Sequence, residues 1–233
     1  MKIGVTLPQF TERAADTIDA AARAEGLGLD GVFCFDHLWP IGEPDGPALS
    51  IVPLLGALAG STSTISIGTL VARVGLLPDS LLSEVLVTAW EISDGRFIAG
   101  LGTGDRLSRP ENEAFGIPFE SADERRARVR RVATVVQDRG IPVWVGGGEQ
   151  KTIELARSLG ATANLWEAAP ETVAALVESG LEVTWGGPLG RDWNRAEAML
   201  GALAAAGATW AVCAWPESLE LVADVAFSVK DAL

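Results

Sequence analysis

Short apolar runs alternate with longer amphipathic segments along the chain. The first run, IGVTL at residues 3–7, is rich in strand-forming residues, and residues 11–27 follow it with apolar side chains at near-helical spacing. Continuous apolar runs of this length are typical of strands that are buried on both faces. The alternation predicts eight strands, at residues 3–7, 31–35, 65–71, 96–101, 142–145, 162–166, 181–185 and 209–215.

A helix is expected after each of these strands. Several of the helix ends carry local signals: Ser121 and Glu124 have the spacing of a capping box, and Gly26 and Gly28 close the first helix. The expected helices cover residues 11–27, 48–60, 79–93, 121–140, 150–159, 171–179, 192–206 and 217–229.

Strands that alternate with helices form parallel sheets, because a parallel connection must cross over the sheet. Eight such units in 233 residues favour a closed barrel, and no linker or low-complexity segment interrupts the series. The sequence therefore predicts an α/β fold, a single (β/α)8 TIM barrel over residues 1–233. An open, doubly wound sheet is the alternative.

The composition excludes several classes of protein. Hydrophobic residues make up 48% and charged residues 21% of the chain, which is unlike a disordered protein. The 31 acidic and 18 basic residues leave a net charge of −13. Because nucleic-acid partners require basic surfaces, we expect no nucleic-acid partner.

The amino-terminal segment and the two cysteines indicate the cellular compartment in which the protein is expected. Glu12 and Arg13 interrupt the chain before the apolar core of a signal peptide develops. Residues 198–216 are uncharged over a membrane-like length, but their glycines and alanines indicate a helix end followed by a strand. Cys34 and Cys213 lie in different expected strands and cannot form a disulfide framework. We expect a cytoplasmic protein that does not span a membrane.

Catalysis in such barrels takes place at the carboxyl ends of the strands, so the residues there are candidates. His37, the only histidine, follows the second expected strand directly after Asp36. An unperturbed imidazole has a pKa of about 6.5, which suits proton exchange near neutral pH. A lone histidine beside an aspartate also occurs as a loop cap, and this alternative stays open.

Two glycine-rich turns follow the fourth and fifth expected strands. Gly146, Gly147 and Gly148 precede a helix, so their backbone amides can hold a phosphate, with a simple tight turn as the alternative. The turn GTGD at 102–105 is similar, but Asp105 repels phosphate and suits hydrogen bonding or proton transfer. Neither turn has the spacing of a P-loop or dinucleotide fingerprint, and no residues have metal-ligand spacing.

Aromatic residues are distributed unevenly, with eight tryptophans and no tyrosine. Four tryptophans lie near the expected upper rim of the barrel, where they can wall an apolar pocket for a flat ring. Ordinary packing under loops is the alternative. The candidate pocket residues are Gln9, Trp39, Trp166, Trp185 and Trp215.

One expected helix, at residues 121–140, is rich in arginine. Five arginines between residues 125 and 131 alternate with apolar side chains. This pattern is typical of a solvated helix with one apolar face, which we favour over an anion-binding site.

An ordered series of motifs connects the chain to a known family. The series comprises KIGVTLPQF, GLDGVFCFDHLWP, ISIGTLVARV, SDGRFIAGLGTGD with AFG after it, and IPVWVGGGEQKTIELARSLGATANLW. Over nearly its whole length the chain thereby resembles the luciferase-like flavin- and deazaflavin-dependent oxidoreductases. The resemblance implies a TIM barrel with reduced insertions, which leaves an open pocket because the large insertions of many relatives are missing.

The resemblance also implies where a cofactor binds. It implies a tricyclic ring at the top of the barrel, with its phosphate on Gly104, Gly147 and Gly148. It further implies a cis peptide bond behind the ring, at Leu70–Val71. The cofactor-binding residues implied in this way are Asp36, Leu70, Val71, Arg73, Gly104, Ser108, Gly147, Gly148 and Gln150.

The catalytic residues implied by the resemblance are His37, Asp36 and Asp105. Members that use coenzyme F420 carry an aspartate–histidine pair beside the deazaflavin, and Asp36 with His37 matches it. His37 is then expected to assist proton transfer while hydride moves between ring and substrate. Asp105 stands where some relatives have glutamate, and Ser108 where asparagine is common, so the role of Asp105 is weakened.

The motifs favour coenzyme F420 over flavin mononucleotide, FMN. The tail of F420 is acidic, and Arg73, Arg106 and Arg109 are expected to form a basic patch at the pocket mouth. The expected function is hydride transfer between F420 and a small organic substrate. An FMN-dependent monooxygenase and a degenerate, non-catalytic flavin-binding protein are the alternatives.

The resemblance also bears on substrate and assembly. The three lysines are Lys2, Lys151 and Lys230, and none lies near a late strand end, which disfavours a sugar phosphate as substrate. Relatives commonly dimerise through barrel helices, so a homodimer is expected.

Overall fold

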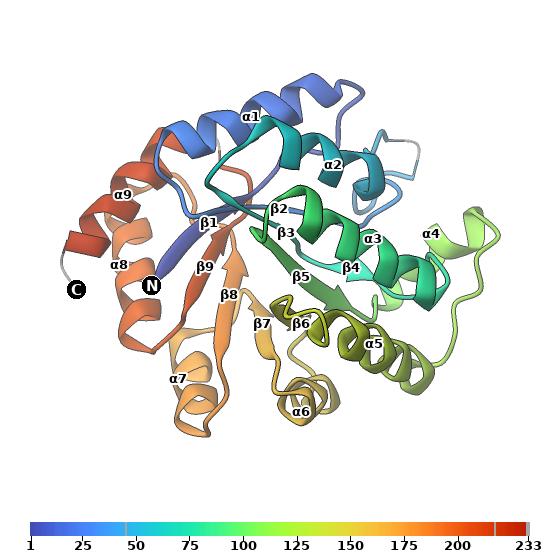
Figure 1. Cartoon of the computed structure of the whole chain (residues 1–233). Helices are drawn as coiled ribbons and strands as arrows, with labels where there is room; N and C mark the ends of the chain where they lie inside the picture. The colour runs from blue at the N-terminus through green and yellow to red at the C-terminus, as the bar shows by residue number, and fades with distance from the viewer. Residues whose placement is uncertain (45, 217, 232–233) are drawn as a thin grey trace.

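The computed structural model describes residues 1–44, 46–216 and 218–231. The strands of this part of the chain pair in parallel in the order β3-β2-β1-β9-β8-β7-β6-β5-β4. A further pairing of β3 with β5 closes the barrel, and Figure 1 shows the helices around its outside. The strands are β1 (Lys2–Thr6), β2 (Gly31–Cys34), β3 (Ser66–Thr69), β4 (Ala72–Arg73), β5 (Phe97–Gly102), β6 (Val143–Gly146), β7 (Thr162–Trp166), β8 (Val183–Gly187) and β9 (Trp210–Cys213).

Helices follow the strands as the amphipathic segments predict, and two short helical pieces are inserted after β5. The helices are α1 (Ala14–Gly26), α2 (Ile51–Ser61), α3 (Asp79–Ile92), η1 (Arg106–Ser108), α4 (Arg109–Ala114), α5 (Ala122–Gln137), α6 (Gln150–Leu159), α7 (Pro170–Glu178), α8 (Trp193–Ala205) and α9 (Leu219–Asp231).

The predicted (β/α)8 TIM barrel is confirmed, and the open sheet is excluded by the β3–β5 pairing. The third predicted strand, residues 65–71, is divided into β3 and β4 at the Leu70–Val71 bond, which is cis as the resemblance implies. Between β5 and α5, where no helix was predicted, residues 106–120 contain η1 and α4. Residues 45, 217, 232 and 233 lie outside the described part, and with them the first residue of the helix expected at 217–229 and the end of the expected domain.

Aromatic side chains fill the interior of the barrel toward the amino ends of the strands. Phe33 of β2 is fully buried and stacks on Trp144, with ring centroids 5.1 Å apart, and meets Trp210 edge-on at 5.7 Å. Small residues make room for it: a Cβ atom on Gly68 would lie 2.5 Å from the Phe33 ring. The Phe33 ring therefore requires glycine at position 68, because the close-packed interior has no space for a further side chain there.

A carboxylate ties the loop after α2 to the end of α1, also at the amino end of the barrel. Glu25 Oε1 accepts hydrogen bonds from the backbone amides of Ser63, Thr64 and Ile65. Burial raises the pKa of Glu25, but these hydrogen bonds outweigh it and lower the pKa to about 2. The carboxylate thus accepts hydrogen bonds from backbone amides that lie just before β3 and would otherwise lack an acceptor.

The arginine-rich segment is the amphipathic helix α5, with Val129, Val132 and Val136 buried. Arg128 and Arg131 form ion pairs with Asp79 of α3, at 2.5 and 2.7 Å. The predicted apolar face is thus confirmed. The solvated face carries inter-helix ion pairs.

Cys34 and Cys213 are both buried and free. Burial raises the pKa of each thiol to about 12, so neither is a nucleophile near neutral pH. Within residues 1–44, 46–216 and 218–231, no helix has the length and apolar composition needed to cross a membrane.

Candidate active site

A cavity of about 540 Å³ opens at the carboxyl ends of the barrel strands. Its volume is typical of small-molecule and cofactor sites. Apolar side chains reach it from the segment after β2 and from the end of β7. Glycines reach it from the turns after β5 and β6, and arginines from η1 and α5. Among its lining residues are Phe35, His37, Ile41, Leu70, Val71, Arg73, Gly104, Asp105, Arg106, Leu107, Ser108, Arg125, Arg126, Gly147, Gly148 and Trp166.

A second hollow, of about 440 Å³, lies at the amino ends of the strands between residues such as Lys2, Arg96 and Glu182. Its main cation is already engaged: Arg96 donates hydrogen bonds to the carbonyls of Ala59 and Ile65 and to Thr62. Catalytic groups of parallel barrels gather at the opposite end. The carboxyl-end cavity is therefore the candidate site.

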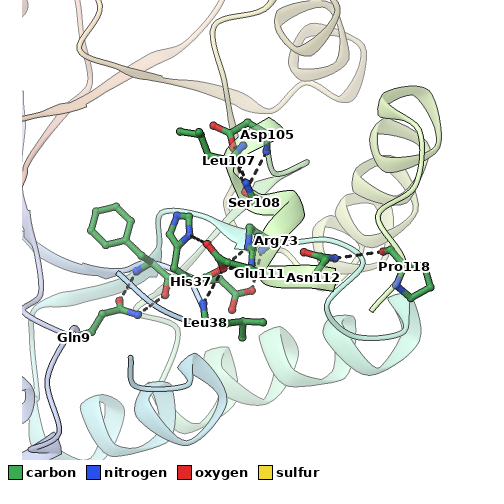
Figure 2. Close-up of polar contacts among 12 residues, drawn as sticks. Gln9, His37, Leu38, Arg73, Asp105, Leu107, Ser108, Glu111, Asn112 and Pro118 are labelled. Atoms are coloured by element: carbon green, nitrogen blue, oxygen red, sulfur yellow. Dashed lines mark hydrogen bonds and ion pairs between the residues drawn. The ribbon is translucent and has the colours of Figure 1, made fainter. Parts of the chain in front are cut away.

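His37 stands at the edge of this cavity, just past the end of β2. Its Nδ1 lies 2.7 Å from Oε1 of Glu111 in α4, and the imidazole keeps 18% of its surface exposed. Within the described residues, Nε2 has no hydrogen-bond partner. Figure 2 shows the ring of His37 turned toward Glu111 through one nitrogen. The other nitrogen is left for a molecule in the cavity.

Glu111 is buried and was not among the residues singled out from the sequence. Its Oε2 accepts hydrogen bonds from the Leu38 amide at 2.9 Å and from the Arg73 guanidinium at 2.6 Å. Burial raises the pKa of this carboxyl, but the hydrogen bonds from His37 and Leu38 and the charge of Arg73 outweigh it and lower the pKa. The only sequence signal was an acidic pair of glutamates just before AFG, in a segment without periodicity.

Asp36 contacts Arg73, not the imidazole. Its Oδ2 accepts the Arg73 backbone amide at 2.9 Å, and its carbonyl accepts Arg73 Nε at 2.6 Å. Burial raises the pKa of Asp36 to about 6, against the lowering effect of Arg73. The carboxylate bonded to His37 is Glu111, and Asp36, predicted as a catalytic and cofactor-binding residue, lies outside the lining of the cavity.

The expected basic patch is corrected as well. Arg73 is buried with its guanidinium bonded to Asp36 and Glu111, and Arg109 pairs with Glu113 outside the cavity lining. Arg106 does line the cavity, and within the described residues its side chain has no hydrogen bond or ion pair.

Two arginines of α5 complete the basic part of the wall. Arg125 and Arg126 line the cavity together with Arg106. Arg125 Nε donates to the Thr103 carbonyl at 2.7 Å, and Arg126 pairs with Asp123. Part of the arginine-rich helix thus faces the cavity, which the interpretation as a solvated face did not foresee.

Asp105 caps a helix. Its Oδ1 accepts the amides of Leu107 and Ser108, at 2.8 and 3.1 Å, and so begins η1 (Figure 2). Asp105 and Ser108 both line the cavity. Because one carboxylate oxygen is held by these amides, Asp105 has a structural task that suffices to explain it.

The turns predicted to hold a phosphate border the cavity. Gly104 and Gly147 have positive φ angles of 65° and 131°, which side chains with a Cβ rarely adopt. A Cβ atom on Gly148 would meet nothing within 4 Å, so this turn is open toward the cavity that it lines. Gln150, by contrast, lies outside the lining and bonds to Glu154 on its own helix.

Of the five predicted pocket residues, only Trp166 lines the cavity, with 45% of its surface exposed. Trp185 is 1% exposed, with its indole N–H bonded to the Ala168 carbonyl, so its assignment to the pocket was wrong. Gln9 is fully buried and bonds to both backbone groups of Phe35. Trp39 and Trp215 also lie outside the lining, Trp39 against Phe115.

No group of three or more histidine, cysteine, aspartate or glutamate side chains in the described residues is arranged to hold a metal ion. At the edge of the cavity, His37 belongs to a hydrogen-bonded cluster of four titratable residues, with Asp36, Arg73 and Glu111.

Sequence comparison relates the chain to named proteins. Residues 1–137 match the model of the family described as luciferase-like monooxygenase. The F420-dependent glucose-6-phosphate dehydrogenase of Beutenbergia cavernae is 33% identical over 148 residues, which are 63% of this chain and 40% of that enzyme. The match therefore spans less than half of the relative's own length.

Solved structures share the fold. An F420-dependent secondary alcohol dehydrogenase in complex with an F420-acetone adduct aligns with a TM-score of 0.81 and 15% identity, over 98% of this chain and 97% of that one. The oxygenating constituent of 3,6-diketocamphane monooxygenase from Pseudomonas putida, in complex with FMN, aligns with a TM-score of 0.63 and 14% identity, over 86% and 71%. At these identities the likeness concerns the fold. Since the family model covers more than half of the 233 residues, the chain belongs to the luciferase-like monooxygenase family.

Proposed function

We propose that the protein is an oxidoreductase that uses coenzyme F420 and transfers hydride between the deazaflavin ring and a small organic substrate. One observation carries the proposal: the single histidine of the chain lines the same cavity as the glycine turns and the arginines, and no described residue hydrogen-bonds to its Nε2. The relative from Beutenbergia cavernae, named as an F420-dependent dehydrogenase, supports it.

The residues present fit such a cofactor. The cavity volume of about 540 Å³ accommodates a tricyclic ring, and the turn at Gly147 and Gly148 lets a ligand approach the backbone closely. Arg106, Arg125 and Arg126 would hold anionic groups of the tail, beside the amino terminus of α6. These cations are concentrated at the cavity of a chain whose net charge is −13.

When bound, F420 supplies a site on its ring that donates or accepts a hydride. His37 supports this chemistry by taking up or releasing a proton at Nε2 as the substrate oxygen or carbon changes its charge. Phe35 and Phe10 flank the imidazole, with ring centroids 6.3 and 6.5 Å from it, and reduce its access to water.

The substrate is proposed to be uncharged and mainly apolar. Phe35, Ile41, Leu107 and Trp166 reach the cavity, with Ile41 and Leu107 more than half exposed. No lysine lines the cavity within the described residues. A sugar phosphate would need cations that the proposed tail already occupies, so small ketones, aldehydes, enones and alcohols are the classes to examine.

The test is a fluorescence titration of the apo-protein with F420 and with FMN in one buffer. We expect a lower Kd for F420. Arg106→Gln should weaken F420 binding about twofold to fivefold, because it removes one solvent-screened ion pair. Arg109→Gln, outside the cavity lining, is the matched control and should leave Kd unchanged.

Other outcomes would change the proposal. Preferential binding of FMN would indicate an FMN-dependent monooxygenase, and oxygen consumption with a flavin reductase would then be measured. Binding of F420 without oxidation or reduction of any substrate class would favour a non-catalytic flavin-binding protein. Binding of neither cofactor would contradict the proposal.

Location and assembly complete the proposal. The two buried free thiols fit a reducing compartment, and we propose a cytoplasmic location. A homodimer through the barrel helices is proposed on family grounds, and light scattering of the purified protein would test it. A monomer at micromolar concentration would contradict it.

A further inference from the structure

Glu111, in the short helix α4, accepts hydrogen bonds from three groups that lie outside this helix. Its side chain is 2% exposed, and it accepts bonds from His37 Nδ1, the Leu38 amide and Arg73 Nη2, at 2.7, 2.9 and 2.6 Å. Figure 2 shows the three donors converging on this one carboxylate. A buried charge is kept only where partners compensate for its lost hydration, and all three partners come from outside α4.

The two oxygens of Glu111 have different surroundings. Oε2 accepts hydrogen bonds from two N–H donors, of Leu38 and Arg73, whereas the imidazole of His37 is the one partner of Oε1 among the described residues. An ionised carboxylate accepts hydrogen bonds and cannot donate them. Nδ1 of His37 must therefore carry the hydrogen, which leaves Nε2 of the neutral ring as a proton acceptor.

The other charged groups around His37 do not bond to its imidazole. Asp36, from the same segment, gives Oδ2 to the Arg73 amide, and Arg73 itself contacts Asp36 and Glu111 but not the imidazole. Asp105 binds amides of η1. Glu111 alone among these residues contacts a ring nitrogen of His37.

We propose that Glu111 is a positioning residue that holds neutral His37 as the Nδ1–H tautomer, with the basic Nε2 directed to the cavity. Glu111 acts through His37 and touches neither cofactor nor substrate. The tautomer is a property of the protein by itself. Its effect on hydride transfer rests on the proposed F420-dependent function.

The chain allows a direct measurement, because His37 is its only histidine. Nitrogen NMR of protein labelled at histidine, made without a histidine tag, reports one imidazole and needs no assignment. Above the pH at which the ring loses its second proton, we expect Nδ1 to be protonated and Nε2 not. This is the reverse of the tautomer that an unconstrained histidine side chain favours in water.

Glu111→Gln gives the sharpest contrast. The two donors at Oε2 will retain the amide oxygen, so the NH2 group will face His37 Nδ1, which must then accept. We expect the neutral ring to switch to the Nε2–H tautomer. Glu113→Gln, on the same helix but paired with Arg109 and 62% exposed, is the control and should resemble the wild type.

Kinetics provide the functional arm. With F420 bound, Glu111→Gln should slow single-turnover hydride transfer about 100-fold or more, because a histidine in the wrong tautomer cannot accept the proton. The Kd for F420 should change less than about twofold. A loss of structure alone would weaken binding and rate together at every pH.

Several results would overturn the inference. A wild-type His37 that is protonated at Nε2 refutes it even if Glu111→Gln fails to fold. An unchanged tautomer in a folded Glu111→Gln protein refutes it too. If F420 does not bind but the tautomer switches as expected, the positioning role stands and only the proposed function fails.

Discussion

Two carboxyls at opposite ends of the barrel have pKa values that shift in opposite directions. At the amino end, Glu25 meets three backbone amides, and its pKa falls to about 2. At the carboxyl end, half-buried Asp36 lies near His37, Arg73 and Glu111, and partial loss of solvent raises its pKa to about 6. The interior of the amino end is filled by aromatic rings, whereas the carboxyl end surrounds a cavity.

The difference separates stability from function in one fold. Burial of Phe33 and its neighbours stabilises the barrel, and the ionised Glu25 adds to this. The buried charges at the carboxyl end cost hydration energy that only partly returns as hydrogen bonds. Such groups are retained at positions that perform chemistry. Four substitutions, two at each end of the barrel, test this difference.

The largest effect is expected at the cavity. His37→Ala should lower the single-turnover rate of hydride transfer about 10²- to 10⁴-fold, the usual contribution of general acid–base catalysis. The Kd for F420 and the melting temperature should stay close to the wild-type values, because the ring is at the edge of the cavity. Stopped-flow absorbance measures the rate, and an unchanged rate would remove His37 from the reaction.

The next effect is expected at the amino end. Phe33→Ala should lower the free energy of unfolding by about 3–5 kcal/mol, since it empties the space between Trp144 and Trp210. Urea denaturation measures this loss. Trp166→Ala, at the half-exposed rim of the cavity, is the control and should cost about 1 kcal/mol or less. Equal losses from both substitutions would contradict the proposed division between the ends.

Asp36→Asn should stabilise the protein near neutral pH. A carboxyl whose pKa rises from 3.8 to about 6 on folding loses its favourable contribution as the pH rises through about 6. The wild type is therefore at a disadvantage of about 2–3 kcal/mol at pH 7.5, which vanishes below about pH 4. Urea denaturation at both pH values is the measurement, with the exposed Asp19→Asn as control. A destabilised Asp36→Asn at pH 7.5 would refute the expectation.

The smallest effect, with the opposite sign, is expected for Glu25→Gln. Because the pKa of Glu25 is lowered on folding, its contribution is present above its unfolded value of 4.5 and is lost as the pH falls through about 2. Solvent screening limits it to about 1 kcal/mol. Unfolding free energies at pH 7 and pH 3 should show the variant approaching the wild type in acid. If the two proteins differed in unfolding free energy by the same amount at both pH values, packing and not charge would explain the contribution of Glu25.

The prediction of the site from the sequence was accurate for some residues and wrong for others. His37 and the turns at Gly104 and Gly147 line the cavity as predicted, because they follow strands whose positions the apolar runs indicate. Trp185 and Gln9 follow or end strands in the same way, yet both are buried and hydrogen-bonded internally. Position along a strand does not say whether a side chain faces the cavity or the neighbouring helices.

Glu111 could not be found by that reasoning. It lies in a segment of short helices with no hydrophobic period, and 74 residues separate it from His37. The roles of Arg73 and Arg106 were likewise indistinguishable in the sequence. The Arg73 guanidinium is buried in an ion pair, whereas Arg106 lines the cavity with no ion-pair partner among the described residues. Their charge identified these arginines as a group. It did not show which of them would form an ion pair with a carboxylate inside the protein.

The barrel follows from the amino-acid sequence alone, because local hydrophobic periodicity and turn signals accumulate along the chain and leave few ways to bury eight parallel strands. The sequence also indicates the end of the barrel at which the candidate site lies. Which carboxylate contacts the histidine depends instead on tertiary packing. Whether a buried ion forms a hydrogen bond depends on differences of a few tenths of an ångström in the donor–acceptor distance. The two partners are far apart in sequence, so no local pattern encodes this distance.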